Sequence, residues 1–421
     1  MALIELESAA TTGALPARRG RDEFPPRLAL ALTFASAAAI LLSIAASQIL
    51  MGAALVVALL SGRGLRMPPF FKPLLVFLAI TVIADLFSGD ARAGLPQIRK
   101  FYVFAIALLA YTFLGAGRRI HALAMAWTAA AFLSALLGIH QFLARLAEAR
   151  RLYWNIYEYV LDKRMTGFAG HWMTFGGEQM IALLLLTSLL LFGGRSRWKA
   201  LGWAVWLVIA ASLVLGMTRS VYLAGFPAGL AWLVWHRRKA VLWLVPLICA
   251  IAFFFVPGHV RERIVSVARP HGNVDSNGRR MIMARAGWAM VRSHPWLGIG
   301  PEQPGRQFDR YVPASVPRPL PKGWYGHLHN IYLQYAAERG VPALLALLWA
   351  IARAAADCRR ALRDSAGNRA WILHGALAVI IAVLVEGLFE HNLGDSEILT
   401  MFLIVLACAS AAAVKGDEPC G

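Results

Sequence analysis

Apolar runs close to 20 residues long recur along most of the chain, and they constrain the fold more than any other feature. A hydrophobic stretch of about 20 residues is the length that an α-helix needs to cross a bilayer. Of the 421 residues, 59% are hydrophobic and only 15% are charged, and the mean hydropathy is +0.58. Soluble proteins are usually about 45–50% apolar and about 25% charged. We therefore expect an all-α integral membrane protein.

The runs predict about twelve transmembrane helices, with a thin break at Ser47-Gln48 inside the first apolar stretch. They lie at 28–46, 48–62, 70–88, 101–116, 121–143, 174–193, 200–217, 220–236, 240–256, 331–352, 370–389 and 397–414. The chain then divides into an N-terminal tail (1–27), helices 1–9 (28–256), a long polar loop (257–330), helices 10–12 (331–414) and a C-terminal tail (415–421).

The distribution of basic residues predicts the orientation. Cytoplasmic loops carry an excess of Lys and Arg. With the N-terminus in the cytoplasm, every short inside connection has a basic cluster, whereas the connections at 47, 218 and 390–396 are poor in Lys and Arg. Both tails are then cytoplasmic and the loop 257–330 faces outward. The net charge of +19 need not indicate nucleic acid, because basic loops also bind anionic membrane lipids.

The outward loop 257–330 combines many arginines with few acids. Its acidic residues are Glu262, Asp275, Glu302 and Asp309, and its arginines are Arg261, Arg263, Arg269, Arg279, Arg280, Arg285, Arg292, Arg306, Arg310 and Arg318. Within it, 279–292 is expected to be an amphipathic helix, with Met281, Ala284 and Trp288 at helical spacing. Contact with lipid headgroups is one explanation of the charge; a lid over a cationic pocket for a polyanionic substrate is the other.

Two histidines stand where the loop ends and the next helix begins. His329 lies at the expected membrane boundary, and a neutral imidazole near arginines suits a general base. The alternatives are that His329 only caps the helix, or that His327 is the base. His327-Leu328-His329 is half of a metal site, but without a nearby carboxylate we expect no metal. Neither a Walker loop nor a dinucleotide motif is present, so no cofactor is expected.

Two arginines are candidates for binding an anion. Arg219 occupies a tight outward turn, so its side chain either reaches headgroups or points into the bundle toward a substrate. Arg280, with Arg279 beside it, opens the amphipathic segment. Guanidinium groups bind phosphate oxygens in pairs, and several of them could hold a diphosphate without Mg²⁺.

Four motifs in order resemble the O-antigen ligase and polymerase superfamily of bacterial envelope glycosyltransferases. They are Arg164-Met165-Thr166-Gly167-Phe168, Arg219-Ser220-Val221-Tyr222-Leu223, Arg280 followed by His294-Pro295-Trp296-Leu297-Gly298-Ile299-Gly300, and His329-Asn330-x₉-Gly340. The last is similar to the ligase signature, in which a Gly, Thr or Tyr tends to follow the glycine by three residues. Ala343 occupies that place here, which weakens the choice of ligase over polymerase.

The resemblance implies a GT-C-like enzyme of the bacterial inner membrane. It would move O-antigen from undecaprenyl diphosphate to a sugar hydroxyl of lipid A–core oligosaccharide at the periplasmic face, without a metal. His329 is then the base, Arg219, Arg280 and Arg164 bind the diphosphate, and direct attack predicts inversion. The supporting residues are Asn330, Tyr222, Gly340, His327 and Arg279.

Three other functions remain open at this point. An O-antigen polymerase uses the same donor and a growing glycan as acceptor, and a further relative transfers glycans to protein. A transporter of anionic solutes belongs to a different class. Transporters favour internal repeats and helices broken near the midplane, and the sequence shows neither.

Overall fold

The computed structural model describes residues 24–62, 64–152, 155–194, 196–240, 254, 258–269, 277–320, 325–364 and 367–414. The regular secondary structure in these ranges is entirely helical. The first half contains α2 (Phe24–Ala39), α3 (Ile44–Leu60), α4 (Phe71–Leu86), α5 (Ala91–Arg99), η1 (Lys100–Phe104), α6 (Ala105–Phe113), α7 (Gly117–Arg151), α8 (Ile156–Asp162), α9 (Trp172–Phe192) and α10 (Lys199–Leu215). The second half contains η2 (Ser220–Gly225), α11 (Phe226–Arg237), α13 (Gly258–Val265), α14 (Asn277–Ser293), α15 (Gln303–Arg306), α16 (Phe308–Tyr311), α17 (Ile331–Arg363), η4 (Gly367–Arg369), α18 (Ala370–Glu386), η5 (Asn392–Gly394) and α19 (Ser396–Val414).

The protein is a multi-pass membrane protein. Among the described residues, five helices are long and apolar enough to cross a bilayer, and they are Ala91–Phe113, Gly117–Arg151, Trp172–Phe192, Ile331–Arg363 and Ser396–Val414. Shorter apolar helices cover Pro26–Ala39, Ile44–Leu60, Lys199–Leu215 and Ala370–Glu386. The run expected at 240–256 lies outside the described residues except for Ala240 and Phe254.

Two connections differ from the sequence-based expectation. The first apolar stretch turns at 40–43, not at Ser47-Gln48, because the Ser43 side chain accepts the Ala46 N–H and caps α3. Ser47 lies inside α3, where its carbonyl accepts a hydrogen bond from Ser36 Oγ at 2.8 Å. The connection between the apolar runs expected at 70–88 and 101–116 contains helix α5, which continues through η1 into α6.

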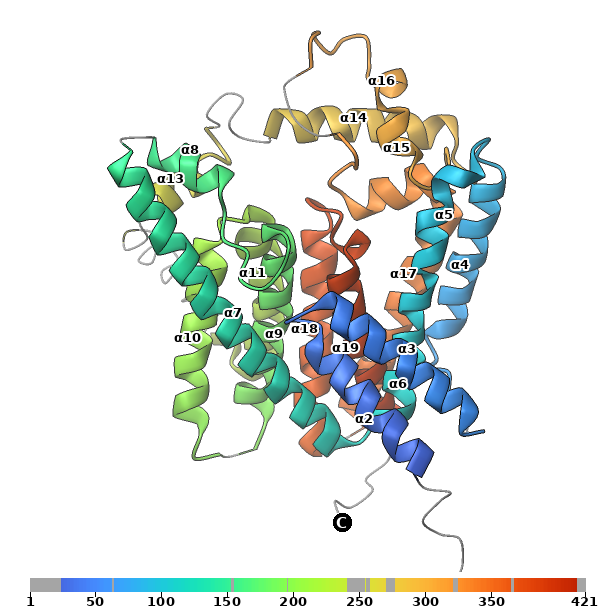
Figure 1. Ribbon diagram of the computed structural model, residues 1–421, viewed down its shortest axis with the longest axis vertical. Helices are drawn as coiled ribbons and strands as arrows, with labels where there is room; N and C mark the ends of the chain where they lie inside the picture. Colours follow the sequence, from blue (N-terminus) through green and yellow to red (C-terminus); the bar gives the residue numbers. More distant parts are fainter. Residues whose placement is uncertain are drawn as a thin grey trace, which may run out of the picture.

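The long helices stand side by side, and the extramembrane elements gather at one end (Figure 1). Helices α9, α18 and α19 are the most deeply buried and form the centre of the apolar core. Helix α14 lies across the end of the bundle at the top of the view, and α8 and α13 lie at the same end. The loop that the sequence placed outside the membrane is therefore a cap over one end of the core.

Helix α14 confirms the helix expected at 279–292, but its buried face is different. The expected stripe is wrong at Met281 and Trp288, which are 58% and 56% exposed. Met283, Ala286, Gly287 and Met290 are buried instead. The reason is the close approach of Leu328: a Cβ on Gly287 would lie 2.7 Å from its Cδ1 atom.

Candidate active site

A glycine break in α17 positions the start of this helix. Gly340 has φ +80° and ψ 164°, so the helical segment before it changes direction there. The break exposes carbonyls that accept the Ile299 N–H (at Ala337, 2.8 Å) and the Gly300 N–H (at Glu338, 3.0 Å). The Val341 N–H donates to Pro295 at 2.8 Å. The 294–300 motif and the Gly340 motif are thus two halves of one joint.

Replacing Gly340 by alanine should destabilise this joint. The positive φ disfavours any side chain, and a Cβ would lie 2.0 Å from the Trp296 carbonyl oxygen, which is backbone and cannot rotate away. We expect the free energy of unfolding to fall by about 2 kcal/mol or more, measured as a lower thermal midpoint in detergent. Gly52→Ala, in the interior of α3 with no atom within 4 Å, should be neutral or stabilising.

The turn before α17 brings His327 and His329 together. His329 has φ +48°, and its backbone N–H donates to His327 Nδ1 at 3.1 Å. The helix cap is Asn330, whose Oδ1 accepts the Leu333 N–H at 2.9 Å. The capping alternative for His329 is therefore wrong, because Asn330 does this and leaves the His329 ring free for another partner.

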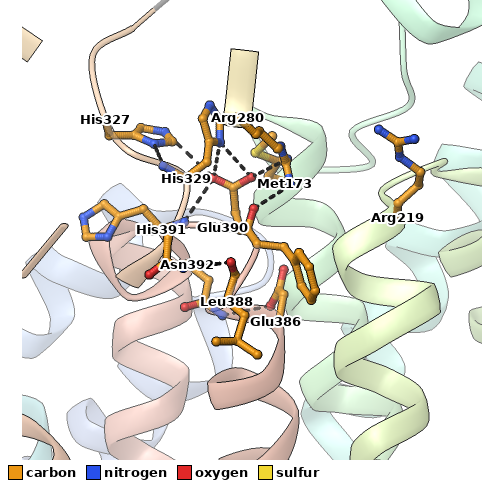
Figure 2. Close-up of polar contacts among 12 residues, drawn as sticks. Met173, Arg219, Arg280, His327, His329, Glu386, Leu388, Glu390, His391 and Asn392 are labelled. Carbon is orange, nitrogen blue, oxygen red and sulfur yellow. Dashed lines mark hydrogen bonds and ion pairs between the residues drawn. The ribbon is translucent and has the colours of Figure 1, made fainter. Parts of the chain in front are cut away.

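That partner is Glu390, from the connection between α18 and α19 (Figure 2). His329 Nδ1 lies 2.8 Å from Glu390 Oε1 and 3.0 Å from Oε2. A carboxylate only accepts hydrogen bonds, so the Nδ1 proton must belong to His329. In the neutral ring, Nε2 then carries the lone pair, which is the arrangement of a general base oriented by a carboxylate.

Backbone contacts hold Glu390 in place. Three successive carbonyls accept hydrogen bonds: Gly387 from the Ile331 N–H at 2.8 Å, Leu388 from Asn330 Nδ2 at 2.9 Å and Phe389 from Arg280 Nη1 at 2.6 Å. Arg280 Nη2 also pairs with Glu390 Oε2 at 3.1 Å. Helices α14, α17 and α18 therefore all meet at this carboxylate.

The charge on Glu390 is well stabilised. Burial alone would raise its pKa, but the hydrogen bond from His329, the positive charge of the His329 ring when protonated and the positive charge of Arg280 lower the pKa to about 2. The carboxylate is therefore ionised at any pH near neutrality. It orients the imidazole and would stabilise the imidazolium that forms when the base takes a proton.

Glu390 was not singled out from the sequence. The connection 390–396 was used only as a segment poor in Lys and Arg. Its signal was the cluster Glu390-His391-Asn392 between two apolar helices, since ionisable residues at a membrane boundary are often functional. Its partner His329 is 61 positions away, so no local pattern could connect them.

Glu390 also changes the argument about metals. Ligand atoms of His327, His329 and Glu390 lie within 4.8 Å of one another and could hold an ion. The premise that no carboxylate is near the two histidines is therefore wrong. The Arg280 ion pair on Glu390 nevertheless opposes a second cation, and the metal-free site remains a prediction.

His327 is less suited to the role of base. Its Nδ1 accepts the His329 N–H, so the neutral ring carries its proton on Nε2, 3.9 Å from Glu390 Oε1. Burial, together with the nearby charge of His329, lowers the pKa of His327 to about 4. His327 is neutral near pH 7, but its lone pair is occupied by the backbone.

Arg164 lies within electrostatic range of Glu390 and of three other arginines, Arg219, Arg263 and Arg280. Arg219, at the start of η2, donates to Ser266 Oγ at 2.9 Å and to Asn277 Oδ1 at 2.6 Å. Arg164 stacks on Trp172, 4.0 Å from the ring centroid. Burial lowers the Arg164 pKa to about 9, and repulsion from Arg263, Arg280 and Arg219 adds to the shift. Arg263, 5% exposed, was not among the residues expected at the site.

Two expected supporting residues lie at the edges of this cluster. Tyr222 is 8% exposed in the π-helical turn η2, and its buried hydroxyl makes no hydrogen bond within the described residues. Arg279 is half-buried on α14, and its charge adds to burial in lowering the Arg280 pKa. The structure thus brings Arg280, His327 and His329 to a carboxylate that the sequence did not indicate, whereas Arg219 bonds Ser266 and Asn277 and Arg164 stacks on Trp172.

Comparison with known families agrees with the motifs. Residues 203–348 match the model of a family described as O-antigen ligase. The chain carries an O-antigen ligase family domain. The match confirms, over these residues, the resemblance seen in the sequence. A search of curated proteins gave no match.

The O-antigen ligase match includes Arg219, Arg280, His327, His329 and Gly340. Arg164 and Glu390 lie outside it, on α8–α9 and α18–α19 connections that the fold brings to the same place. The candidate site therefore extends beyond the matched domain, and its carboxylate comes from the C-terminal part of the membrane bundle.

Proposed function

We propose that this protein is an O-antigen ligase, which transfers O-antigen from undecaprenyl diphosphate to a sugar hydroxyl of lipid A–core oligosaccharide. The observation that carries this proposal is the His329–Glu390 pair with Arg280 bonded to its carboxylate, and with Arg164 within electrostatic range of Arg280, Arg263 and Arg219. Guanidinium groups bind phosphate oxygens in pairs, so arginines grouped beside a general base suit a donor with a diphosphate leaving group.

Electrostatics explain why these arginines suit a diphosphate leaving group. As the glycosidic bond breaks, negative charge grows on the diphosphate, and fixed cations stabilise it without rearranging. Arg219 is held by Ser266 and Asn277, so its position is set before substrate binds. Repulsion within the cluster, seen in the lowered Arg164 pKa, would be relieved on binding.

The proposed reaction is a direct displacement. His329 Nε2 takes the proton of the acceptor hydroxyl, and the hydroxyl oxygen forms a bond to the anomeric carbon of the donor. The bond from that carbon to the diphosphate oxygen breaks, and its electron pair leaves with undecaprenyl diphosphate. One displacement inverts the anomeric configuration. Glu390 keeps the imidazole in the required tautomer throughout.

The proposed setting is a GT-C-like enzyme of the bacterial inner membrane. The site would face the periplasm, with both termini in the cytoplasm and the substrates delivered from the outer leaflet. The cap of α14 over one end of the bundle suits two large amphiphiles that meet at a membrane surface. No metal is required, because arginines replace a divalent cation at the diphosphate.

Polymerase activity is the alternative within the family, and Ala343 is the sequence feature that favours it. A test is to supply purified protein in proteoliposomes with an undecaprenyl diphosphate-linked glycan and lipid A–core. Glycan attached to lipid A–core supports a ligase. Longer lipid-linked glycan with unmodified lipid A–core would instead identify a polymerase. In cells, loss of a ligase leaves bare core, whereas loss of a polymerase leaves core with one repeat.

Replacing Arg219 by lysine should lower the transfer rate less than replacing it by alanine, but both substitutions should lower it. Removing one preorganised charge from a transition state typically costs about 10²–10³-fold in rate, and we expect this loss for Arg219→Ala. Lysine keeps the charge but cannot reach Ser266, Asn277 and a phosphate together, so we expect about tenfold loss. Initial transfer rates in proteoliposomes measure both.

Arg292→Ala is the matched control, since this arginine is exposed on the loop helix α14. It should leave the transfer rate within about twofold, as surface substitutions usually do. Equal losses for Arg219→Ala and Arg292→Ala would mean that general positive charge, and not a placed guanidinium, supports the reaction.

A further inference from the structure

A cavity of about 230 Å³ lies beside Glu390. The proposed displacement gives this cavity no role. Its lining includes Glu390, Glu386, Asn392 and Asp395 from the α18–α19 connection and its flanks, and His171 and Met173 from the start of α9. His327 also lines it, and the His327 ring centroid is 4.1 Å from that of His329. The cavity is therefore lined by the two side chains that contact the proposed base, His327 and Glu390.

The lining of this cavity differs in chemistry from the arginine cluster. Its described lining has three carboxyl groups and none of the four arginines. Figure 2 shows Glu386 and Asn392 on one side of Glu390 and Arg280 on the other. Carboxylates at close range repel phosphate, so the arginine side of Glu390 suits the diphosphate better than this cavity does.

Asn392 in the lining is held in place by its side-chain nitrogen, but its side-chain oxygen lacks a partner within the described residues. Asn392 is 5% exposed; its Nδ2 donates to Glu386 Oε2 at 2.9 Å and to the Val383 carbonyl at 3.0 Å. Within the described residues, its Oδ1 accepts no hydrogen bond. A buried acceptor without a donor costs free energy unless a ligand or water satisfies it.

Hydrogen bonds also fix the orientation of the Asp395 carboxylate. Its Oδ1 accepts the Glu397 N–H at 3.0 Å and the Ile398 N–H at 3.4 Å, and the Thr174 hydroxyl donates to Oδ2. The lining therefore offers several fixed acceptors and imidazoles. Such a set fits a ligand rich in hydroxyl donors.

We propose that this cavity is the subsite for the acceptor sugar, and that it selects a hydroxyl-rich sugar without phosphate at this position. The inference rests on the proposed function, and deepens it. The acceptor would lie on the carboxylate side of Glu390 and the donor diphosphate on the arginine side. The acceptor hydroxyl would reach His329 between these two sides. Electrostatic attraction and repulsion would then keep each substrate on its own side of Glu390.

The test separates acceptor kinetics from donor kinetics in proteoliposomes, with lipid A–core as acceptor and undecaprenyl diphosphate-linked glycan as donor. Met173→Trp fills the cavity without removing a charged group, and Asn392→Ala removes the unpartnered acceptor atom. We expect either change to raise the acceptor KM about tenfold and to leave the donor KM within about twofold. Met281→Trp, at an exposed methionine of α14, is the control and should change neither.

A binding measurement keeps this test independent of turnover. Lipid A–core binding to the His329→Ala protein should weaken about tenfold when Met173→Trp is added, and core phosphorylated on its terminal sugar should bind less tightly than unphosphorylated core. Unchanged binding and unchanged acceptor KM in both cavity variants, or a rise in donor KM alone, would overturn the subsite. Absence of transfer by the wild-type protein, with binding still sensitive to Met173→Trp, would instead overturn the ligase proposal and leave the subsite standing.

Discussion

Replacing His329 by alanine should reduce glycan transfer by about 10²–10⁴-fold, the usual contribution of a placed general base. The physical reason is the tautomer: Glu390 holds the proton on Nδ1 and leaves the Nε2 lone pair for the acceptor hydroxyl. The acceptor would then have to attack as a neutral alcohol. Single-turnover transfer in proteoliposomes at equal protein level measures this loss.

Two histidine variants test whether the loss belongs to His329 alone. His140→Ala alters an exposed histidine of α7, outside the motifs of the site, and should keep near wild-type rates. His327→Ala should be intermediate, because the His327 ring supports the His329 backbone through its Nδ1. Normal transfer by His329→Ala would remove the catalytic assignment, and a larger loss for His327→Ala would reassign it to that ring.

Glu390→Gln should lower the transfer rate by about 10²–10³-fold, as expected for a lost electrostatic stabiliser. The pKa of Glu390 is about 2, so the wild-type carboxylate is charged throughout the assay range and stabilises the imidazolium. Glutamine nearly preserves the shape but not the charge. It also allows the ring to rotate or change tautomer, and it weakens the hold on Arg280.

A double mutant decides whether Glu390 acts through His329. If it does, Glu390→Gln should cost little once His329 is already alanine, because the two losses are not additive. Additive losses would show that Glu390 acts independently, for example by holding Arg280 alone. Asp309→Asn is the control, since Asp309 is an exposed acid of the same loop whose side chain is 81% exposed.

The joint between Gly340 and the 294–300 segment shows why these motifs are separated as they are. Asn330 caps α17, and ten residues later, at Gly340, the helix breaks where the loop backbone docks. The spacing from His329 to Gly340 therefore sets the length of the segment that carries the base. A substitution at Gly340 should disturb the site through this joint and not through contact with substrate.

The sequence alone predicts the helical membrane class of this protein, its family resemblance and helix α14. Apolar runs near 20 residues predict a multi-pass helical protein because a bilayer accepts little else. The motifs at Arg219, Arg280 and His329-Asn330-x₉-Gly340 predict the family, and the pattern at 279–292 predicts helix α14. These are local signals, carried by residue type, period and short spacing.

Only the tertiary structure decides which of these residues meet, and which partner they share. Glu390 joins His329 and Arg280 across 61 and 110 positions of the chain, and the cavity beside it combines α9 with the α18–α19 connection. The buried face of α14 was likewise decided by Leu328 and not by its own hydrophobic period. The physical reason is that hydrogen bonds and packing join groups by distance in space, which a pattern of neighbours along the chain does not contain.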